Sequence, residues 1–151
     1  MRSYFLAYLD RCALAQPFYH LFTSTHSRGP MLEPFVVTSI VQLLTRMTKL
    51  GWFEDEGYRS IIDDAKKFLD RGTAEGSQGH YFLGLKILNM LVQDMNQPTP
   101  NRTLTQHRKV AVSFRDQSLF QVFQVALVAL RQLLDNVAAG DKLKEQVCFC
   151  L

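Results

Sequence analysis

The stretch Glu33–Phe53, EPFVVTSIVQLLTRMTKLGWF, has the clearest structural pattern in the chain. Its apolar residues recur every three or four positions and line one side of a helix: Val36, Ile40, Leu43, Leu44, Met47 and Leu50. The expected polar side carries Thr38, Gln42, Thr45, Arg46 and Lys49. Pro34 suits the first turn because it lacks an N–H, and Gly51 follows the last turn as an expected left-handed cap. The stretch therefore predicts an amphipathic helix with both ends marked.

Two more helices of the same kind follow this stretch. The first has a face formed by Tyr58, Ile61, Ile62, Ala65, Phe68 and Leu69, and Gly72 is expected to close it. The second has a face formed by Tyr81, Leu85, Leu88, Leu91, Val92 and Met95, widened by Leu83, Ile87 and Met90. A face this wide is more than one partner helix can cover.

The last part of the chain predicts a short helix and then a long one. Thr103 and Gln106 match a capping box ahead of the short helix. Asp116 and Ser118 are candidate N-caps for the long helix, Leu119 to about Val137, which is apolar nearly all round. Because no stretch alternates apolar and polar residues as strands do, the sequence predicts an all-α chain.

Composition narrows the class of protein. The chain has 151 residues, 47% of them hydrophobic, and a formal net charge of +3, which suits one domain without the basic stripe that nucleic acid requires. Three cysteines form neither a disulfide framework nor a zinc-spaced set. Asp10 and Arg11 interrupt the apolar start too early for a signal peptide, and no apolar run is long enough to span a membrane.

The spacing of the helices indicates a repeat protein. Helix onsets near Pro34 and Gly79 lie 45 residues apart, which is within the range of HEAT-type repeats. Each antiparallel pair has an apolar face that it cannot bury alone, so stacking of pairs is expected. The prediction is an α-solenoid of about three HEAT-type helix pairs.

Three segments resemble one known family. They are EPFVVTSIVQLLTRMTKLGWF, LGLKILNMLVQDMNQ and LTQHRKVAVSFRDQSLFQVF, with Thr48-Lys-Leu-Gly-Trp52 and Ser113-Phe-Arg-Asp116 as the most distinctive parts. They are similar to the amino-terminal HEAT repeats of the exportin-7 branch of nuclear transport receptors, also called Ran-binding proteins 16 and 17, within the importin-β (karyopherin) superfamily. The resemblance implies that the chain corresponds to a truncated part of a much longer solenoid.

The resemblance also implies a division of the chain. Residues 1–9 look like the remnant of a HEAT helix, residues 31–137 like a HEAT-repeat array, and residues 138–151 like a tail. Residues 10–30 have no counterpart in the family pattern and are expected to form an irregular insertion. Trp52, the only tryptophan, is expected to fill the space between adjacent repeats.

The resemblance implies a binding function. The family binds the GTP-bound form of the small GTPase Ran through the inner helices of its amino-terminal repeats, carries protein cargo past nuclear pore proteins, and shuttles between nucleus and cytoplasm. The helices Pro34–Leu50 and His80–Met95 are expected to be inner ones here. Their non-core faces give the candidate Ran contacts: Gln42, Arg46, Lys49, Lys86, Asn89 and Gln93.

Two other functions remain open, and an enzyme is not expected. An α-solenoid scaffold without Ran dependence would show the same repeats, and Cys148, the fourth-last residue, permits a prenylated protein. The four histidines (His20, His26, His80 and His107) are scattered without metal-ligand spacing, so no metal or cofactor is expected. Nothing supplies a nucleophile, a base and an oxyanion site together.

Overall fold

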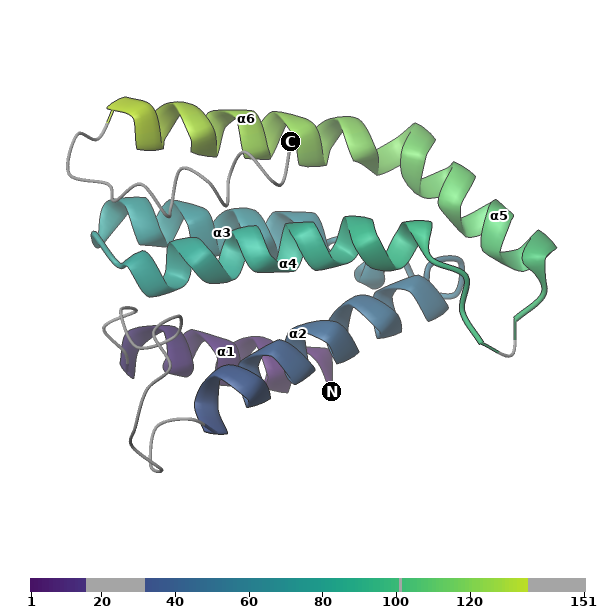
Figure 1. The fold of residues 1–151 in the computed structure, drawn as a ribbon, viewed down its shortest axis with the longest axis horizontal. Coiled ribbons are helices and arrows are strands. Elements are labelled where there is room, and N and C mark those ends of the chain that lie inside the picture. Colours follow the sequence, from purple (N-terminus) through teal and green to yellow (C-terminus); the bar gives the residue numbers. More distant parts are fainter. Residues whose placement is uncertain (16–31, 101, 136–151) are drawn as a thin grey trace.

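The computed structural model describes residues 1–15, 32–100 and 102–135 (Figure 1). The helices are α1 (Arg2–Ala15), α2 (Leu32–Leu50), α3 (Ile61–Ala74), α4 (Gln78–Asn96), α5 (Leu104–Phe114) and α6 (Phe120–Asp135). A 3₁₀ turn, η2 (Glu56–Tyr58), precedes α3, and a π-helical turn, η3 (Arg115–Leu119), joins α5 to α6. No strand occurs in these three ranges, so the all-α prediction is confirmed.

The helices stack as successive layers. Figure 1 shows α1 and α2 as one layer, α3 and α4 as the next, and the long element α5–η3–α6 beyond them. Helices α2 and α4 run in the same general direction and lie nearer the viewer than α1 and α3. This is the arrangement of an α-solenoid fragment with two complete helix pairs, followed by the helix that would begin a third.

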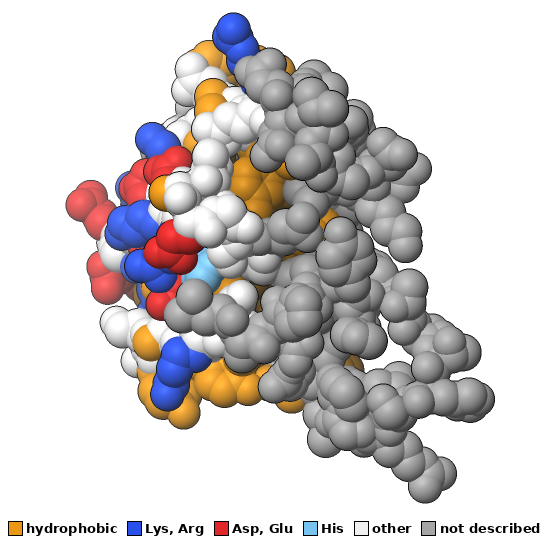
Figure 2. All heavy atoms as spheres, turned by 90° about the vertical axis from the view of Figure 1, so that its left-hand side faces the viewer, with side chains coloured by type: hydrophobic (Ala, Val, Ile, Leu, Met, Phe, Trp, Pro, Cys, Tyr) orange, Lys and Arg blue, Asp and Glu red, His pale blue; other side chains and the backbone are white. Residues whose placement is uncertain are grey.

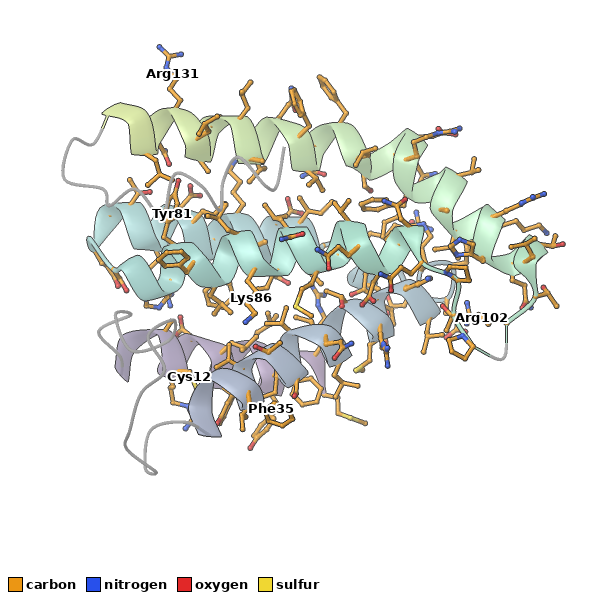
Figure 3. The ribbon with its side chains drawn as sticks, in the orientation of Figure 1. Cys12, Phe35, Tyr81, Lys86, Arg102 and Arg131 are labelled. Atoms are coloured by element: carbon orange, nitrogen blue, oxygen red, sulfur yellow. The ribbon has the colours of Figure 1, made fainter. Side chains whose placement is uncertain are left out.

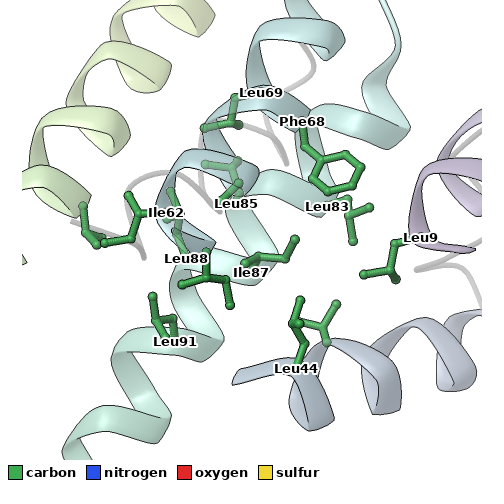
Figure 4. Close-up of a cluster of buried hydrophobic side chains, with 14 of the residues drawn as sticks. Leu9, Leu44, Ile62, Phe68, Leu69, Leu83, Leu85, Ile87, Leu88 and Leu91 are labelled. Carbon is green, nitrogen blue, oxygen red and sulfur yellow. The ribbon is translucent and has the colours of Figure 1, made fainter. Parts of the chain in front are cut away.

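Helix α4 lies at the centre of the core, because it packs against α1, α2, α3 and α5. Its predicted wide apolar face is confirmed: Leu83, Leu85, Ile87, Leu88 and Leu91 are all buried. Figure 4 shows side chains of α1 (Leu9) and α2 (Leu44) on the same cluster as those of α3 and α4. One continuous core therefore joins the layers.

The roles of the glycines at the helix ends differ from the prediction. Gly72 lies inside α3, where a Cβ atom would come within 2.7 Å of the Tyr81 backbone nitrogen, so it permits close packing on α4. The left-handed residue after α3 is Gly76, with a φ of 62°. The expected left-handed cap at Gly51 was wrong, because Gly51 does not have a positive φ and instead makes room for the Tyr58 ring.

The buried face of α2 is partly polar, contrary to the prediction. Thr45 and Thr48 are fully buried, whereas Leu43 is 45% exposed and Leu50 is 42% exposed. The Thr48 hydroxyl donates a hydrogen bond to the Leu44 carbonyl, at 3.0 Å, within the same helix. The apolar periodicity predicted the wrong buried face for α2. Residues of α4 accept hydrogen bonds from Thr45 and Lys49, so these polar side chains can be buried.

The predicted N-caps Asp116 and Ser118 were wrong, because α5 continues through η3 into α6 without a break. One buried stripe crosses the junction: Val110, Phe114, Ser118, Val122, Ala126, Ala129 and Leu133. Repeated steps of four residues drift around an α-helix, which has 3.6 residues per turn. The wider π turn takes up this drift and keeps the stripe facing the core.

Three other predictions concern the start of α5, the insertion after α1 and the tail of the chain. Thr103 and Gln106 form the expected capping box at the start of α5, so that prediction is confirmed. The irregular insertion was expected to begin at residue 10. Helix α1 instead continues to Ala15. The remainder of that insertion, residues 16–30, and the tail, residues 138–151, lie outside the described residues.

Candidate functional site

Polar side chains connect α2 to α4 along their length, and we call this set the α2–α4 seam: Thr38, Thr45, Lys49, Lys86 and Asp94. Lys86 Nζ donates to Thr38 Oγ1 at 2.6 Å, and Thr45 Oγ1 donates to the Asp94 carboxylate. Lys49 Nζ donates to the Asp94 carbonyl at 2.6 Å and to the Gln97 carbonyl. Three of these pairs are separated by 48 or 49 residues. A constant separation is what two parallel helices in successive repeats require.

Lys49 is not on an exposed face, so its expected placement was wrong. Its side chain is only 4% exposed, and its ammonium lies on the last carbonyls of α4. Burial lowers the pKa of Lys49, and the positive charges of Arg102 and Arg46 lower it further, while Asp94 opposes this change. The Lys49 ammonium therefore links the two repeats by hydrogen bonds and is too buried for a partner protein to contact.

Lys86 also binds within the α2–α4 seam and is not a freely exposed side chain. It is half-buried, its ammonium is bound to Thr38, and burial lowers its pKa. A partner would have to compete with Thr38 for this ammonium. Lys86 can orient the two helices but offers little to an incoming surface.

The other four candidate residues remain accessible. Gln42 and Arg46 are exposed on α2, Gln93 is exposed on α4, and Asn89 is half-buried beside it. Gln93 Nε2 donates to Asn89 Oδ1 at 2.9 Å, which leaves further donors and acceptors on both amides. We call these four residues the α2–α4 face.

Arg102 was missed by the sequence analysis and lies at one end of this face. Its guanidinium donates to the Leu50 carbonyl at 3.1 Å, at the end of α2. Its charge acts on Lys49, as does that of Arg46, so three cations gather near the end of α4. In Figure 3 Arg102 lies beside the link that follows α4. The only sequence signal was its position after the Pro98 and Pro100 link, which does not indicate a fold contact.

Trp52 connects the turn after α2 to α5, as predicted. It is fully buried, its Nε1 donates to Ser113 Oγ at 3.0 Å, and its ring meets Phe114 edge-on at 5.7 Å. The guanidinium of Arg59 lies 5.8 Å from the centre of the Trp52 ring. Trp52 is therefore a packing residue between the turn after α2 and helix α5.

Charged side chains gather on a different side of the molecule. Figure 2 shows them on the side formed by α1 and α3, where Arg71 binds Asp10 and Arg2 binds Asp64. These pairs border a hollow of about 220 Å³ between the two helices. Asp10 also lies 3.2 Å from Nε2 of the buried His80, whose other ring nitrogen meets Ser77 Oγ at 2.8 Å. His80 is a buried packing residue, stacked on Phe68.

The described residues hold no gathering of three His, Cys, Asp or Glu side chains that could bind a metal ion. Within the same ranges, no helix is long and apolar enough to cross a bilayer. The α2–α4 face is an array of three amides and one guanidinium on two packed helices. Such an array fits a macromolecular surface better than a small ligand, which would require a concave pocket.

Comparisons with known proteins give consistent relatives. Ran-binding protein 17 of Mus musculus is 45% identical over 109 residues, or 70% of this chain. Exportin-7-A of Xenopus laevis is 38% identical over 107 residues, and Ran-binding protein 16 of Drosophila melanogaster is 37% identical over 123 residues, or 68% and 75% of this chain. No family model and no solved structure matches the chain.

The matched part of each relative is small. The chain spans about a tenth of the length of the curated relatives it matches, 9% to 11% for these three. Their names describe export and Ran binding, and none of the three names an enzyme. By its identity to these proteins and its stacked helix pairs, the chain belongs to the exportin-7 and Ran-binding protein 16/17 branch of the importin-β family.

Proposed function

We propose that the chain is a segment of a nuclear transport receptor and that its α2–α4 face contributes to binding Ran in the GTP-bound form. The observation that carries the proposal is the 45% identity to a protein named Ran-binding protein 17. In this proposal the receptor carries protein cargo past nuclear pore proteins and shuttles between nucleus and cytoplasm. Binding requires no cofactor, no nucleic acid and no membrane.

The geometry of the face supports a protein partner. Gln42 and Arg46 extend from α2, while Asn89 and Gln93 extend from α4. The seam holds these two helices in one register, so the four side chains are presented without a large ordering cost on binding. Arg46 carries the charge expected to matter most, because exposed cations steer association with an acidic surface.

The test is binding of the purified chain to Ran loaded with a non-hydrolysable GTP analogue or with GDP. Circular dichroism on the same sample checks that the chain is helical. We expect selective binding of the GTP-analogue form, and a loss of about tenfold for Arg46→Glu, equivalent to about 1.4 kcal/mol. Lys66→Glu is the matched control, because Lys66 is exposed on α3, away from the face.

Three results would contradict the proposal. A folded chain that binds neither form of Ran would exclude it for this segment. Equal binding to both forms would favour a scaffold without Ran dependence. If both glutamate variants weakened binding equally, Ran would bind the segment through its general charge and not through the α2–α4 face.

A further inference from the structure

Two arginines lie close together at one end of the α2–α4 face. Arg46 is exposed one turn before the end of α2, and Leu50 follows it by four residues on the same side of the helix. Arg102 Nη2 donates to the Leu50 carbonyl at 3.1 Å, so the Arg102 guanidinium lies just beyond that last turn. This side chain is half-buried, and its one hydrogen bond leaves other N–H groups for a partner. We call Arg46 and Arg102 the arginine pair.

The arginine pair lies beside a third cation, the buried Lys49. Burial lowers the pKa of Lys49, and the charges of Arg102 and Arg46 lower it further, so both guanidinium groups lie near enough to repel its ammonium. The carboxylate of Asp94 opposes this effect, and it already accepts a hydrogen bond from Thr45. Two surface cations beside a buried one give this end of the face a positive potential, which attracts acidic groups.

The arginine pair spans a junction between two consecutive repeats. Arg46 belongs to α2, and Arg102 lies beside the link between α4 and α5 in Figure 3. The bonds from Lys49 to the end of α4 and from Arg102 to the end of α2 hold the three elements together. All the neighbours that fix the positions of the two arginines are therefore present in the structure.

We propose that the arginine pair is the part of the α2–α4 face that binds carboxylate groups of the partner protein. This inference rests on the proposed function; it adds Arg102 as a contact residue and names the chemistry of the surface that this residue meets. Arginine suits the role because its planar guanidinium can donate two parallel hydrogen bonds to one carboxylate. The amides of Gln42, Asn89 and Gln93 supply uncharged hydrogen bonds on the same face.

Arg102 also has a structural role, because the Leu50 carbonyl belongs to the last turn of α2 and has no partner further along the helix. Two substitutions separate this role from binding. Arg102→Gln keeps an N–H donor for the carbonyl but removes the charge. Arg102→Lys keeps both a donor and the charge. If the charge binds the partner, the two variants differ in affinity although both retain a donor for α2.

The test is titration of the full 151-residue chain with Ran bound to a non-hydrolysable GTP analogue, at several salt concentrations. Arg102→Gln should weaken binding about tenfold and make the affinity less dependent on salt, whereas Arg102→Lys should stay within about threefold of the wild type. Arg131→Gln is the matched control with the same change of charge. Arg131 is exposed on α6 and points away from α3 and α4 in Figure 3, so this variant should bind as the wild type does. Circular dichroism checks that each variant is folded.

Two results with the variants would overturn this inference and leave the proposed function standing. The first is a wild-type chain that binds Ran while Arg102→Gln binds it equally well, because Arg102 would then serve only α2. The second is an equal loss for Arg102→Lys and Arg102→Gln, because the charge would then not be what the partner recognises.

Three results with the wild-type chain would also overturn the inference, and they need no variant that folds. Ran binding that does not weaken as salt rises would exclude contacts between charged groups. Displacement of Ran by a short uridine oligonucleotide would assign the arginine pair to the phosphate groups of a nucleic acid. A folded chain that binds neither form of Ran would overturn the proposed function together with this inference.

Discussion

Helix α4 contacts its two main neighbours in different ways. Against α3 it packs apolar side chains and approaches closely at Gly72 and Gly84, where a Cβ atom would lie within 3 Å of the other helix. Against α2 it makes hydrogen bonds through Thr45, Lys49 and Lys86. The contact inside a repeat is therefore mainly apolar, and the contact between repeats is partly polar.

This difference separates stability from register. Apolar burial contributes most of the folding free energy but tolerates sliding, because it has no direction. Hydrogen bonds between specific side chains fix how far one helix lies along another. In this chain the α3–α4 contact is expected to supply stability, and the α2–α4 seam is expected to hold the register of the α2–α4 face.

The largest effect is expected from Leu88→Ala in the α3–α4 contact. Leu88 is 1% exposed, so truncation should leave a cavity and cost about 3 kcal/mol of unfolding free energy. Urea denaturation followed by circular dichroism measures the change. A cost below about 1 kcal/mol would mean that this contact does not dominate stability.

A smaller effect is expected at Tyr81, which connects α4 to α6. Its hydroxyl donates to the Ala129 carbonyl at 2.6 Å, and burial raises its pKa to about 12. Because the unfolded chain loses this proton at about pH 10, the folded state is expected to lose stability between pH 10 and pH 12. The loss should be just under 3 kcal/mol, from two pKa units at about 1.4 kcal/mol per unit.

Tyr81→Phe is the control for this pH dependence. Urea denaturation at several pH values should show that the variant lacks the decline between pH 10 and pH 12. Lys49 and Lys86, whose pKa values are lowered, increase stability as the pH rises toward 10.5, and they do so in both proteins. A decline of equal size in both proteins would show that Tyr81 is not its cause.

Lys49→Met is expected to cost less, about 1 kcal/mol. The change keeps most of the side-chain volume but leaves the Asp94 and Gln97 carbonyls without this donor. It should weaken Ran binding as well, because the seam orients Gln42 and Gln93. A change in stability without any change in Ran affinity would separate the seam from the face.

The smallest effect is expected at the surface contact between α3 and α6. Gln121 Nε2 donates to Asp63 Oδ1 at 3.1 Å, and both residues are exposed. Gln121→Ala should change the unfolding free energy by less than about 0.5 kcal/mol. A larger loss in urea denaturation would mean that polar surface contacts between repeats matter more than the comparison with α3–α4 indicates.

Most of the helices could be predicted from the sequence, because apolar periodicity depends only on which residues face the core. The apolar faces of α3 and α4 are the clearest cases, since nearly every predicted member is buried. Thr103 and Gln106 were also predictable, because a capping box is a local signal.

The errors have a different physical origin. Thr45 and Lys49 are buried because α4 supplies their hydrogen-bond partners 45 to 49 residues away. Asp116 and Ser118 match N-cap chemistry, yet the buried stripe through Phe114 and Val122 keeps the helix continuous. A local pattern does not include these distant contacts. The role of Gln42, Arg46, Asn89 and Gln93 in Ran binding stays a prediction.

The bond from Lys49 to the end of α4 also affects how the chain unfolds. The last carbonyls of a helix carry partial negative charge, and here a cation from the preceding repeat neutralises it. Loss of the first helix pair would therefore leave the end of α4 uncompensated and prone to fray. Loss of α6 would not have this consequence for α2. Unfolding should thus pass more readily from the first repeat to the second than in the reverse direction.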